Sequence, residues 1–570
     1  MNGRSGEPGP PPDAAARSRR RQRNITLAMG AVAFVALAGL LVEYGFPHPR
    51  HAAIWHEVQT DCALLFILLQ CARPAVSLKP FRHLREHRLD YALMFLLVFG
   101  LIASASLRNS PEFRYLAGHG AAETLDAINV LAIQCYLVFL VVLKSPWFHR
   151  ALLALPFGAI TALWTSFAAL IGLSTLLLMT PGAVTPGRSV TWVQALFTAT
   201  SAACVTGLSV VDTATHWSPF GQGVILATIQ LGGLGILTLT GSVALLGGGP
   251  LGARERRSLV EISETDALPQ VRAALVRPLV FTAVIEAAGA LLLFRTWWNP
   301  DGHVMRQAWQ AIFHSVSAFC NAGFSAFSDQ LYGYRDDPAT LGIVASLIIA
   351  GGLGFGTLWD LVRARLTAQS RAALLSIAVL VPAGGLGIWI LERDHALAVC
   401  PEGTRLLNAL FLSVSSRTAG FQTTDLGGLT LAGSALIIML MLIGGAPGST
   451  AGGIKTTTFW AIAARDQAAA YRRRALAVAV AVPAVFAASG VLVSWITAAA
   501  IGGIWFESAS AVGTVGLSRG ITAGLPSSAH LVLVAAMFFG RVGPFILAFA
   551  LRRQGRRAGV AVSHEPYLIG

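Results

Sequence analysis

The sequence predicts an all-α polytopic membrane protein, with four fused helix–pore-loop–helix repeats around one axis, preceded by about four extra transmembrane helices. Three observations support this fold class. Of 570 residues, 54% are hydrophobic and 12% are charged, and mean hydropathy is +0.63, whereas soluble globular proteins carry about 25% charged residues. A short stretch ending in glycine recurs four times between long apolar runs. Arginine-rich segments separate these repeats.

The N-terminal part divides into a basic tail and a helical region. Residues 1–24 are rich in Pro, Gly, Ala and Arg, which predicts a disordered tail because this composition cannot bury a core. Residues 25–150 are expected to form accessory helices, since they hold apolar segments near the ~20 residues that span a bilayer. These segments cover residues 25–45, 53–72, 90–107 and 126–144. The last one lacks the regularly spaced arginines of a voltage sensor, which favours an accessory or dimerisation role.

The four repeats follow from residue 151 onward. Their expected boundaries are 151–255, 256–366, 367–468 and 469–551, with a cytoplasmic C-terminal tail at 552–570. In each repeat a long apolar run precedes a shorter segment, a glycine loop and a second long run. The second long runs, each expected to be a spanning helix, are residues 221–248, 340–362, 430–463 and 529–551. The shorter segments are residues 190–204, 305–320, 404–417 and 502–513. They are too short to span a membrane, and non-helical backbone at that depth must be buried or line a cavity. We therefore expect four half-spanning helices whose loops surround one pore.

The charge distribution predicts the orientation. Lys and Arg number 42 against 28 Asp and Glu, a net charge of +14. The arginines cluster between apolar runs on the side of the N-terminus, which is typical of cytoplasmic loops. Clusters lie at residues 254–257, 363–365, 472–474 and 552–557. The chain is thus expected to be a multi-pass protein of the cell membrane with both termini cytoplasmic, and nucleic-acid binding is not expected.

The four glycine loops predict an ion-selective filter. Rings of backbone carbonyls can replace the water of a cation such as K⁺ without adding net charge. Glycine allows the dihedrals that turn carbonyls toward one axis, and the C-terminal ends of the short helices add partial negative charge. A single glycine could be an ordinary kink, but four in register favour a filter. The candidate ion-binding residues are Cys204, Val205, Thr206, Gly207, Cys320, Asn321, Ala322, Gly323, Arg417, Thr418, Ala419, Gly420, Gly513, Thr514, Val515 and Gly516.

Three motifs carry a family resemblance: residues 315–325 (SVSAFCNAGFS), 413–421 (SVSSRTAGF) and 506–518 (FESASAVGTVGLS). They are similar to the pore loops of the Trk/Ktr/HKT superfamily of potassium transporters, and residues 152–551 resemble its TrkH/KtrB-like translocating subunits. The resemblance implies K⁺ uptake, by a channel or a symporter. In this family a serine at the first filter glycine accompanies Na⁺ permeation, so Gly207 favours K⁺. A Na⁺-permeable or Na⁺/K⁺-coupled transporter is the alternative.

A glycine-rich interruption of the third repeat is the candidate gate. Five glycines and a proline within residues 444–453 are incompatible with an intact helix. Such backbone must line the cavity below the filter, where it can obstruct permeation; the resemblance implies the same intramembrane gate. The alternative is a packing kink. The candidate gate residues are Gly444, Gly445, Ala446, Pro447, Gly448, Ser449, Thr450, Ala451, Gly452, Gly453, Lys455 and Arg541.

Several charges are expected inside the membrane. Arg541 lies within the last spanning helix, where a charge is costly unless paired or hydrated. The resemblance implies that it is an electrostatic barrier to cations; snorkelling toward the cytoplasm is the alternative. We expect Arg417 to pair with Glu286 or Glu507, and His314 to form a hydrogen-bonded brace. Three aspartates follow the glycines and either enrich cations or cap loops: Asp212, Asp329 and Asp425.

No catalytic or cofactor site is expected. The six cysteines lack metal-ligand spacing, and no nucleotide-binding glycine motif or nucleophile–base set is evident, so an enzyme is disfavoured. An inverted-repeat solute transporter is disfavoured because all four repeats begin on the same side. K⁺ is the expected transported ion, bound at the filter alone. The resemblance implies a homodimer and a separate cytoplasmic nucleotide-binding ring as partners, besides membrane lipid. Candidate docking segments are residues 254–257 and 472–474.

Overall fold

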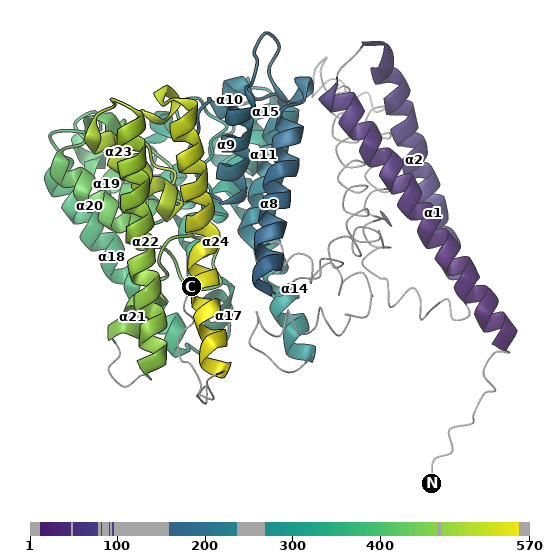
Figure 1. Cartoon of the computed structure of the whole chain (residues 1–570). Coiled ribbons are helices and arrows are strands. Elements are labelled where there is room, and N and C mark those ends of the chain that lie inside the picture. Colours follow the sequence, from purple (N-terminus) through teal and green to yellow (C-terminus); the bar gives the residue numbers. More distant parts are fainter. Residues whose placement is uncertain are drawn as a thin grey trace. The chain divides into compact units, whose positions relative to one another are not determined.

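The computed structural model describes residues 12–46, 49–77, 159–235, 268–463 and 469–557, with a few single positions between 81 and 98. Within these ranges the chain is helical, and its only β-type pairings are two isolated bridges. It divides into two compact units (Figure 1): residues 1–156 with 240–259, and residues 157–239 with 260–570.

The first unit contains the helix pair α1 (Pro12–Gly45) and α2 (Pro49–Val76). Ser18 Oγ, near the start of α1, donates to Val76 O at the end of α2 (2.8 Å), so the two helices are antiparallel. The expectation of disorder is wrong for residues 12–24, which belong to α1. Alanine and arginine favour helix, and proline suits a first helical position. The predicted helices at 90–107 and 126–144 lie almost entirely outside the described residues.

The second unit contains four successive groups of a long helix, a short helix, a loop and another helix (Figure 1). The short helices agree closely with the predicted half-spanning segments. The groups are α8 (Ala159–Leu178), α9 (Trp192–Ala203) and α11 (Pro219–Leu234); α14 (Leu268–Thr296), α15 (Val304–Phe319) and α16 (Pro338–Leu353); α18 (Ala368–Glu392), α19 (Glu402–Ser416) and α20 (Leu431–Leu442); and α22 (Ala469–Ile496), α23 (Ile501–Gly513) and α24 (Ser527–Arg557).

The short helices begin at the protein surface and end in its core. A capping box starts α9, in which Thr191 and Gln194 satisfy each other's backbone amides. The inner part of each short helix is buried, and the hydrophobic core gathers around their C-terminal ends. The four loops that follow therefore lie at the centre of the unit. Short single turns complete the outer connections: η1 (Pro181–Ala183), α10 (Thr213–His216), η2 (Tyr332–Tyr334), η3 (Leu426–Gly428) and η4 (Thr522–Gly524).

The closing helices of the repeats differ. Helix α24 is continuous, as predicted, and the third repeat is interrupted between α20 and α21 (Thr456–Ala463), also as predicted. The expectation of one helix over 340–362 is wrong, because α16 and α17 (Phe355–Val362) meet at an angle of 102°. The bend lies at Gly354, whose φ of 80° is left-handed and suits glycine. The preceding Gly351 and Gly352 further weaken the helix.

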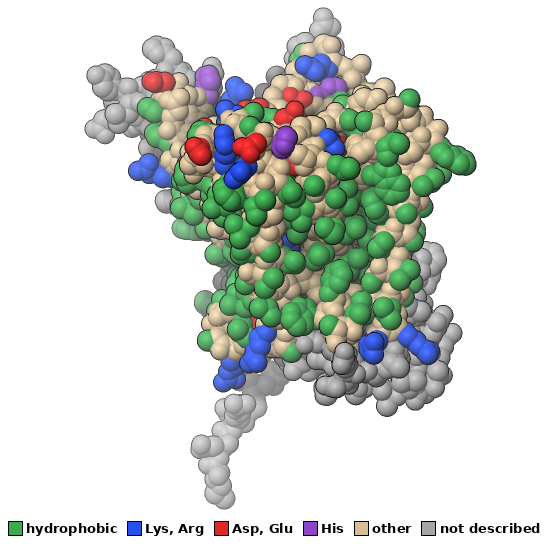
Figure 2. Space-filling view, turned by 90° about the vertical axis from the view of Figure 1, so that its left-hand side faces the viewer, with side chains coloured by type: hydrophobic (Ala, Val, Ile, Leu, Met, Phe, Trp, Pro, Cys, Tyr) green, Lys and Arg blue, Asp and Glu red, His purple; other side chains and the backbone are tan. Residues whose placement is uncertain are grey.

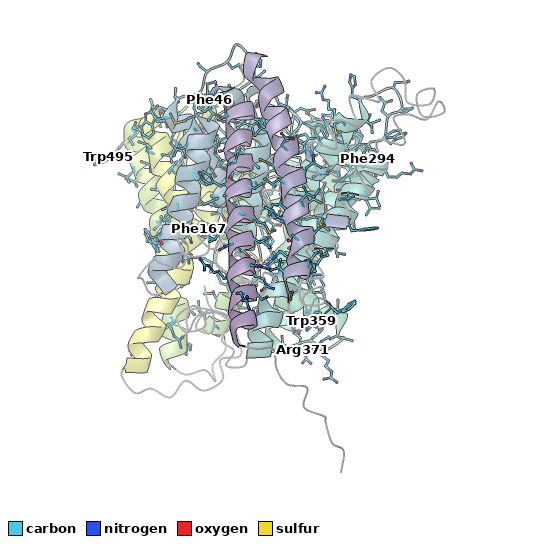
Figure 3. All side chains as sticks on the ribbon, turned by 90° about the vertical axis from the view of Figure 1, so that its right-hand side faces the viewer. Phe46, Phe167, Phe294, Trp359, Arg371 and Trp495 are labelled. Atoms are coloured by element: carbon cyan, nitrogen blue, oxygen red, sulfur yellow. The ribbon has the colours of Figure 1, made fainter. Side chains whose placement is uncertain are left out.

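The surface of the second unit has the character of a membrane protein. Three of the described helices are long and apolar enough to cross a bilayer, or four if the bent pair α16–α17 is one span. Figure 2 shows a broad hydrophobic band between an upper edge with charged and histidine side chains and a lower edge with Lys and Arg. Trp495, 86% exposed, lies toward one end and Trp359 at the other (Figure 3). Tryptophans concentrate at the two interfaces of a membrane.

Candidate functional site

The four loop glycines form a closed ring. Each has a left-handed φ, between 67° and 96°, and each lies against the backbone of the next glycine loop, so that a Cβ atom would collide with a carbonyl oxygen. The fourth glycine meets the first loop and closes the circle. A Cβ atom would lie 2.4 Å from Ala322 O at Gly207, 2.7 Å from Ala419 O at Gly323, 2.4 Å from Val515 O at Gly420 and 2.1 Å from Thr206 O at Gly516.

A second left-handed residue occurs two positions before each glycine. These residues are Val205 (φ 56°), Asn321 (φ 59°), Thr418 (φ 74°) and Thr514 (φ 50°). Such a φ is uncommon for non-glycine residues, and for a β-branched side chain it is a genuine outlier that surrounding structure must enforce. Alternation of left-handed and ordinary dihedrals turns successive carbonyls to the same side of a strand. The structure thus brings the four predicted groups of filter residues together. All four loops have left-handed residues at the glycine and two positions before it.

A serine near the end of each short helix is hydrogen-bonded to the glycine loop that follows it in the sequence. The amide before each glycine donates to the serine carbonyl: Thr206 to Ser201 (2.7 Å), Ala322 to Ser317 (2.7 Å), Ala419 to Ser415 (2.9 Å) and Val515 to Ser510 (2.8 Å). The hydroxyls of Ser201 and Ser510 accept from the glycine amides at 3.0 Å. Those of Ser317 and Ser415 donate to the carbonyls that follow the glycines, at 2.7 and 2.6 Å. Sequence reasoning missed these serines, although every motif contains one.

The third loop is one residue shorter than the others. Ser415 precedes Gly420 by five positions, whereas Ser201 precedes Gly207 by six. The Ser415 carbonyl consequently accepts from both Ala419 and Gly420. Arg417 ends helix α19 with φ −89° and ψ 56°, whereas Cys204 and Cys320 end theirs in the α region.

Two buried side chains brace the outer parts of the loops. His314 Nδ1 lies 2.8 Å from Gln310 O and Nε2 lies 2.9 Å from Ser325 Oγ, so the predicted brace is confirmed. Glu507 occupies the same position in the fourth repeat. It accepts from the Ser518 hydroxyl (2.8 Å), the Arg519 amide (2.9 Å) and the Thr522 hydroxyl (2.7 Å). Each brace joins a short helix to the residue two positions after the glycine.

The predicted pair between Arg417 and a glutamate is wrong. Arg417 Nη2 instead donates to Gly444 O at 3.0 Å. Glu286 accepts from Gln230 Nε2 (3.1 Å) and from Cys320 Sγ (3.7 Å). Arg417 lies at the inner end of α19, where the interrupted segment presents carbonyls without helical partners. The Gly444 carbonyl therefore accepts the hydrogen bond of the guanidinium in place of a carboxylate.

The interrupted segment, residues 443–455, is an ordered loop with a closed neck. Gly444 N donates to Ile454 O (2.9 Å), and Ile454 N donates to Leu442 O (3.3 Å). Its middle is bonded to the bend between α16 and α17. Three backbone bonds join them: Ala446 N to Gly352 O (2.9 Å), Thr450 N to Gly351 O (3.3 Å) and Phe355 N to Gly448 O (3.2 Å).

The same segment lies against the inner ends of the glycine loops. Thr450 Oγ1 donates to Phe319 O at 3.0 Å. Gly452 packs so closely on Thr514 that a Cβ atom would lie 1.8 Å from its hydroxyl. Arg541 donates to Thr450 O through Nη1 and to Gly232 O through Nη2 (2.8 Å). Arg541 therefore ties the segment to the first repeat, which disfavours the snorkelling alternative. Lys455 Nζ donates to Ala451 O at 2.5 Å.

The outer aspartates act as caps in two of three cases. Asp212 Oδ1 accepts from Ala214 N, and Asp425 Oδ1 accepts from Gly427 N, each at 2.8 Å. Asp329 accepts from Tyr332 N through its backbone carbonyl at 3.0 Å. The described residues contain no group of three or more His, Cys, Asp or Glu suited to a metal ion.

Comparisons with known proteins identify the family of the chain. The family model TrkH, described as cation transport protein, matches residues 131–479 and 476–556. Ktr system potassium uptake protein B of Vibrio alginolyticus is 34% identical over 68% of this chain and 90% of its own length. Potassium/sodium uptake protein NtpJ of Enterococcus hirae is 35% identical over 65% of this chain and 88% of its own length. The crystal structure of the potassium transporter TrkH from Vibrio parahaemolyticus shares the fold, with a TM-score of 0.55 and 18% identity over 82% of this chain and 97% of that one. The chain therefore belongs to the TrkH family of cation transport proteins, a family of multi-pass membrane transporters rather than enzymes.

Proposed function

We propose that this chain takes up K⁺ across the cell membrane through a gated, channel-like pore. The observation that carries the proposal is the closed ring of loop glycines, in which each glycine abuts the carbonyl of the next loop. A ring of convergent backbone carbonyls can replace the hydration shell of a monovalent cation. The C-terminal ends of α9, α15, α19 and α23 precede the ring and add partial negative charge there.

The loop sequences favour K⁺ as the ion. Glycine stands at all four ring positions, and at Gly207 no side-chain oxygen is added to the ring. The relative from Vibrio alginolyticus is named a potassium uptake protein. The Enterococcus relative is named a potassium/sodium uptake protein, which supports Na⁺ permeation or Na⁺/K⁺ coupling as a second candidate.

Segment 443–455, with Arg541, is the proposed gate. It lies directly against the inner ends of the second and fourth glycine loops, and Arg541 adds a positive charge at the same depth through its contact with Thr450. A cation leaving the filter inward would meet both. Movement of the segment would clear the path without disturbing the long helices that hold the loops.

Orientation and partners complete the proposal. The glycine loops face outward and both termini are cytoplasmic, because the arginine-rich joints lie on one side. A homodimer with a cytoplasmic nucleotide-binding ring is the proposed assembly, supported by the resemblance of the pore motifs. The basic segment 472–474 at the start of α22 is its candidate docking surface; segment 254–257 lies outside the described residues.

Growth of a K⁺-uptake-deficient cell at limiting K⁺ tests the proposal. The wild-type chain should restore growth, and reconstituted protein should carry K⁺ and Rb⁺ in preference to Na⁺. Gly207→Ser should lower this preference. Absence of rescue by well-expressed protein, with each candidate ring subunit supplied, would refute K⁺ uptake. Equal K⁺ and Na⁺ fluxes in the wild type would favour the second candidate.

A further inference from the structure

Two side-chain hydrogen bonds fasten segment 443–455 to the glycine loops. Arg417 Nη2 donates to Gly444 O, and Thr450 Oγ1 donates to Phe319 O, each at 3.0 Å. Arg417 belongs to the third loop, and Phe319 is the last residue of α15, just before the second loop. The neck of the segment is thus attached to the third glycine loop, and its middle is attached to the start of the second loop.

The Arg417 side chain reaches segment 443–455 from the end of α19. It is 7% exposed, and among the residues that the structure describes its hydrogen-bond acceptor is the Gly444 carbonyl. A buried guanidinium needs such partners, since an unpaired buried charge is costly. Its side chain therefore favours the position in which the segment lies against the loops. This assigns Arg417 a role that its place among the filter residues does not suggest.

Thr450 is the point where four elements meet. Its amide donates to Gly351 O in α16 and its hydroxyl to Phe319 O in α15. Its carbonyl accepts from Arg541 in α24. Of the three groups of Thr450 in these contacts, the hydroxyl is the one that a substitution of Thr450 can remove while its backbone contacts stay.

We propose that Arg417 and Thr450 are positioning residues that latch the gate shut against the filter, and that Arg417 acts on the gate rather than as a determinant of ion selectivity. The inference rests on the proposed function. The latch is lost when segment 443–455 moves inward, because both donors then lose their acceptors. Only the second and third loops take part in these two bonds, so the gate is held asymmetrically.

The test compares K⁺ and Na⁺ fluxes of reconstituted full-length variants. Thr450→Val removes the hydroxyl without changing charge, and Thr450→Ser is the matched control that keeps it. Loss of one hydrogen bond should raise K⁺ flux roughly two- to tenfold, with the K⁺/Na⁺ ratio unchanged. Arg417→Met should act in the same direction, and Arg417→Lys separates loss of the bond to Gly444 from loss of charge.

A transport-independent readout keeps the latch distinguishable from the proposed function. Amide hydrogen exchange across residues 446–452 should be faster in Thr450→Val and Arg417→Met than in the wild type or Thr450→Ser. Unchanged exchange and flux in folded Thr450→Val would overturn the latch while leaving K⁺ uptake intact. An altered K⁺/Na⁺ ratio in Arg417→Met and Arg417→Lys would return Arg417 to the filter. A wild type without K⁺ flux would refute the proposed function, whereas the exchange result would still decide the latch.

Discussion

The third glycine loop and the other three reach the same ring by different backbone routes. The other loops have six positions from the helix serine to the glycine, and the third has five, so that Ser415 O accepts two amides. Left-handed residues nevertheless stand at the same two places in all four. The ring therefore constrains the outer part of each loop, while the inner end can vary. That inner end is where Arg417 reaches segment 443–455.

The largest expected effect comes from adding a methyl group to the ring. Gly420→Ala and Gly207→Ala should each lower K⁺ uptake at least tenfold, because a Cβ atom would lie 2.4 Å from a neighbouring carbonyl oxygen. Left-handed strain and overpacking each cost about 1–3 kcal/mol. Rubidium flux measures the loss. Gly403→Ala is the control, since that Cβ meets no atom within 4 Å. Full flux in Gly420→Ala alone would show that the third loop stands outside the ring.

Restoring the missing residue tests the shorter route directly. Insertion of alanine between Ser416 and Arg417 should lower uptake about tenfold, or ~1.4 kcal/mol, because Ser415 O can no longer accept from both Ala419 and Gly420, and the third loop then loses its place in the ring. An insertion after Gly187, an exposed residue in a surface turn, is the control. Normal uptake by the lengthened third loop would mean that the five-position spacing has no function.

The loop serines should differ in importance according to the direction of their hydrogen bonds. Ser201→Ala leaves the buried Gly207 amide without its acceptor, at about 1–3 kcal/mol. Ser415→Ala removes the donor to Phe421 O, and a carbonyl without a partner is better tolerated than an amide without one, so the expected loss is nearer to about 0.5–1.5 kcal/mol. Thermal unfolding in detergent with K⁺ present compares the two. An equal or larger effect at Ser415 would contradict this ranking.

The smallest expected effect is a pH dependence at the outer flank of the first loop. Burial lowers the pKa of His216, Arg188 lowers it further, and Asp212 opposes them. Because the pKa of His216 is lower in the folded state, the unfolded chain takes up a proton first as the pH falls. The contribution of His216 to stability is therefore complete above the pKa of the unfolded state, about 6.5, and is lost as the pH falls from there to the folded-state pKa. His216→Phe, which keeps an aromatic ring beside Trp217, should flatten the pH dependence of unfolding between about pH 7 and 5. An unchanged slope would exclude His216 as its source.

Local sequence signals predicted the elements, and packing between repeats decided the rest. The short helices, the interruption at 443–455 and the His314 brace follow from apolar length, glycine content and residue type within one segment. The bend at Gly354 was missed because its left-handed turn is completed by the bond from Phe355 to Gly448 in another repeat. Arg417 was assigned a carboxylate partner because the free carbonyl at Gly444 exists only once the segment is folded against α19.

The shorter third loop could have been found in the sequence. Aligning the loops on their glycines hides it, whereas aligning them on Ser201, Ser317, Ser415 and Ser510 shows the missing position. The serine is the better reference because it belongs to the helix, whose backbone geometry is regular.

Closure of the ring also has a consequence for biosynthesis. The first and fourth loops meet where Gly516 abuts Thr206 O, yet the fourth loop is the last to leave the ribosome. Until then the carbonyls of three loops lie in the membrane beside an open gap, and unpaired backbone there is costly. The nascent chain must therefore keep these loops hydrated or shielded for most of its synthesis. A chain cut short before residue 501 should be recognised as unassembled and degraded, however well its first three repeats insert.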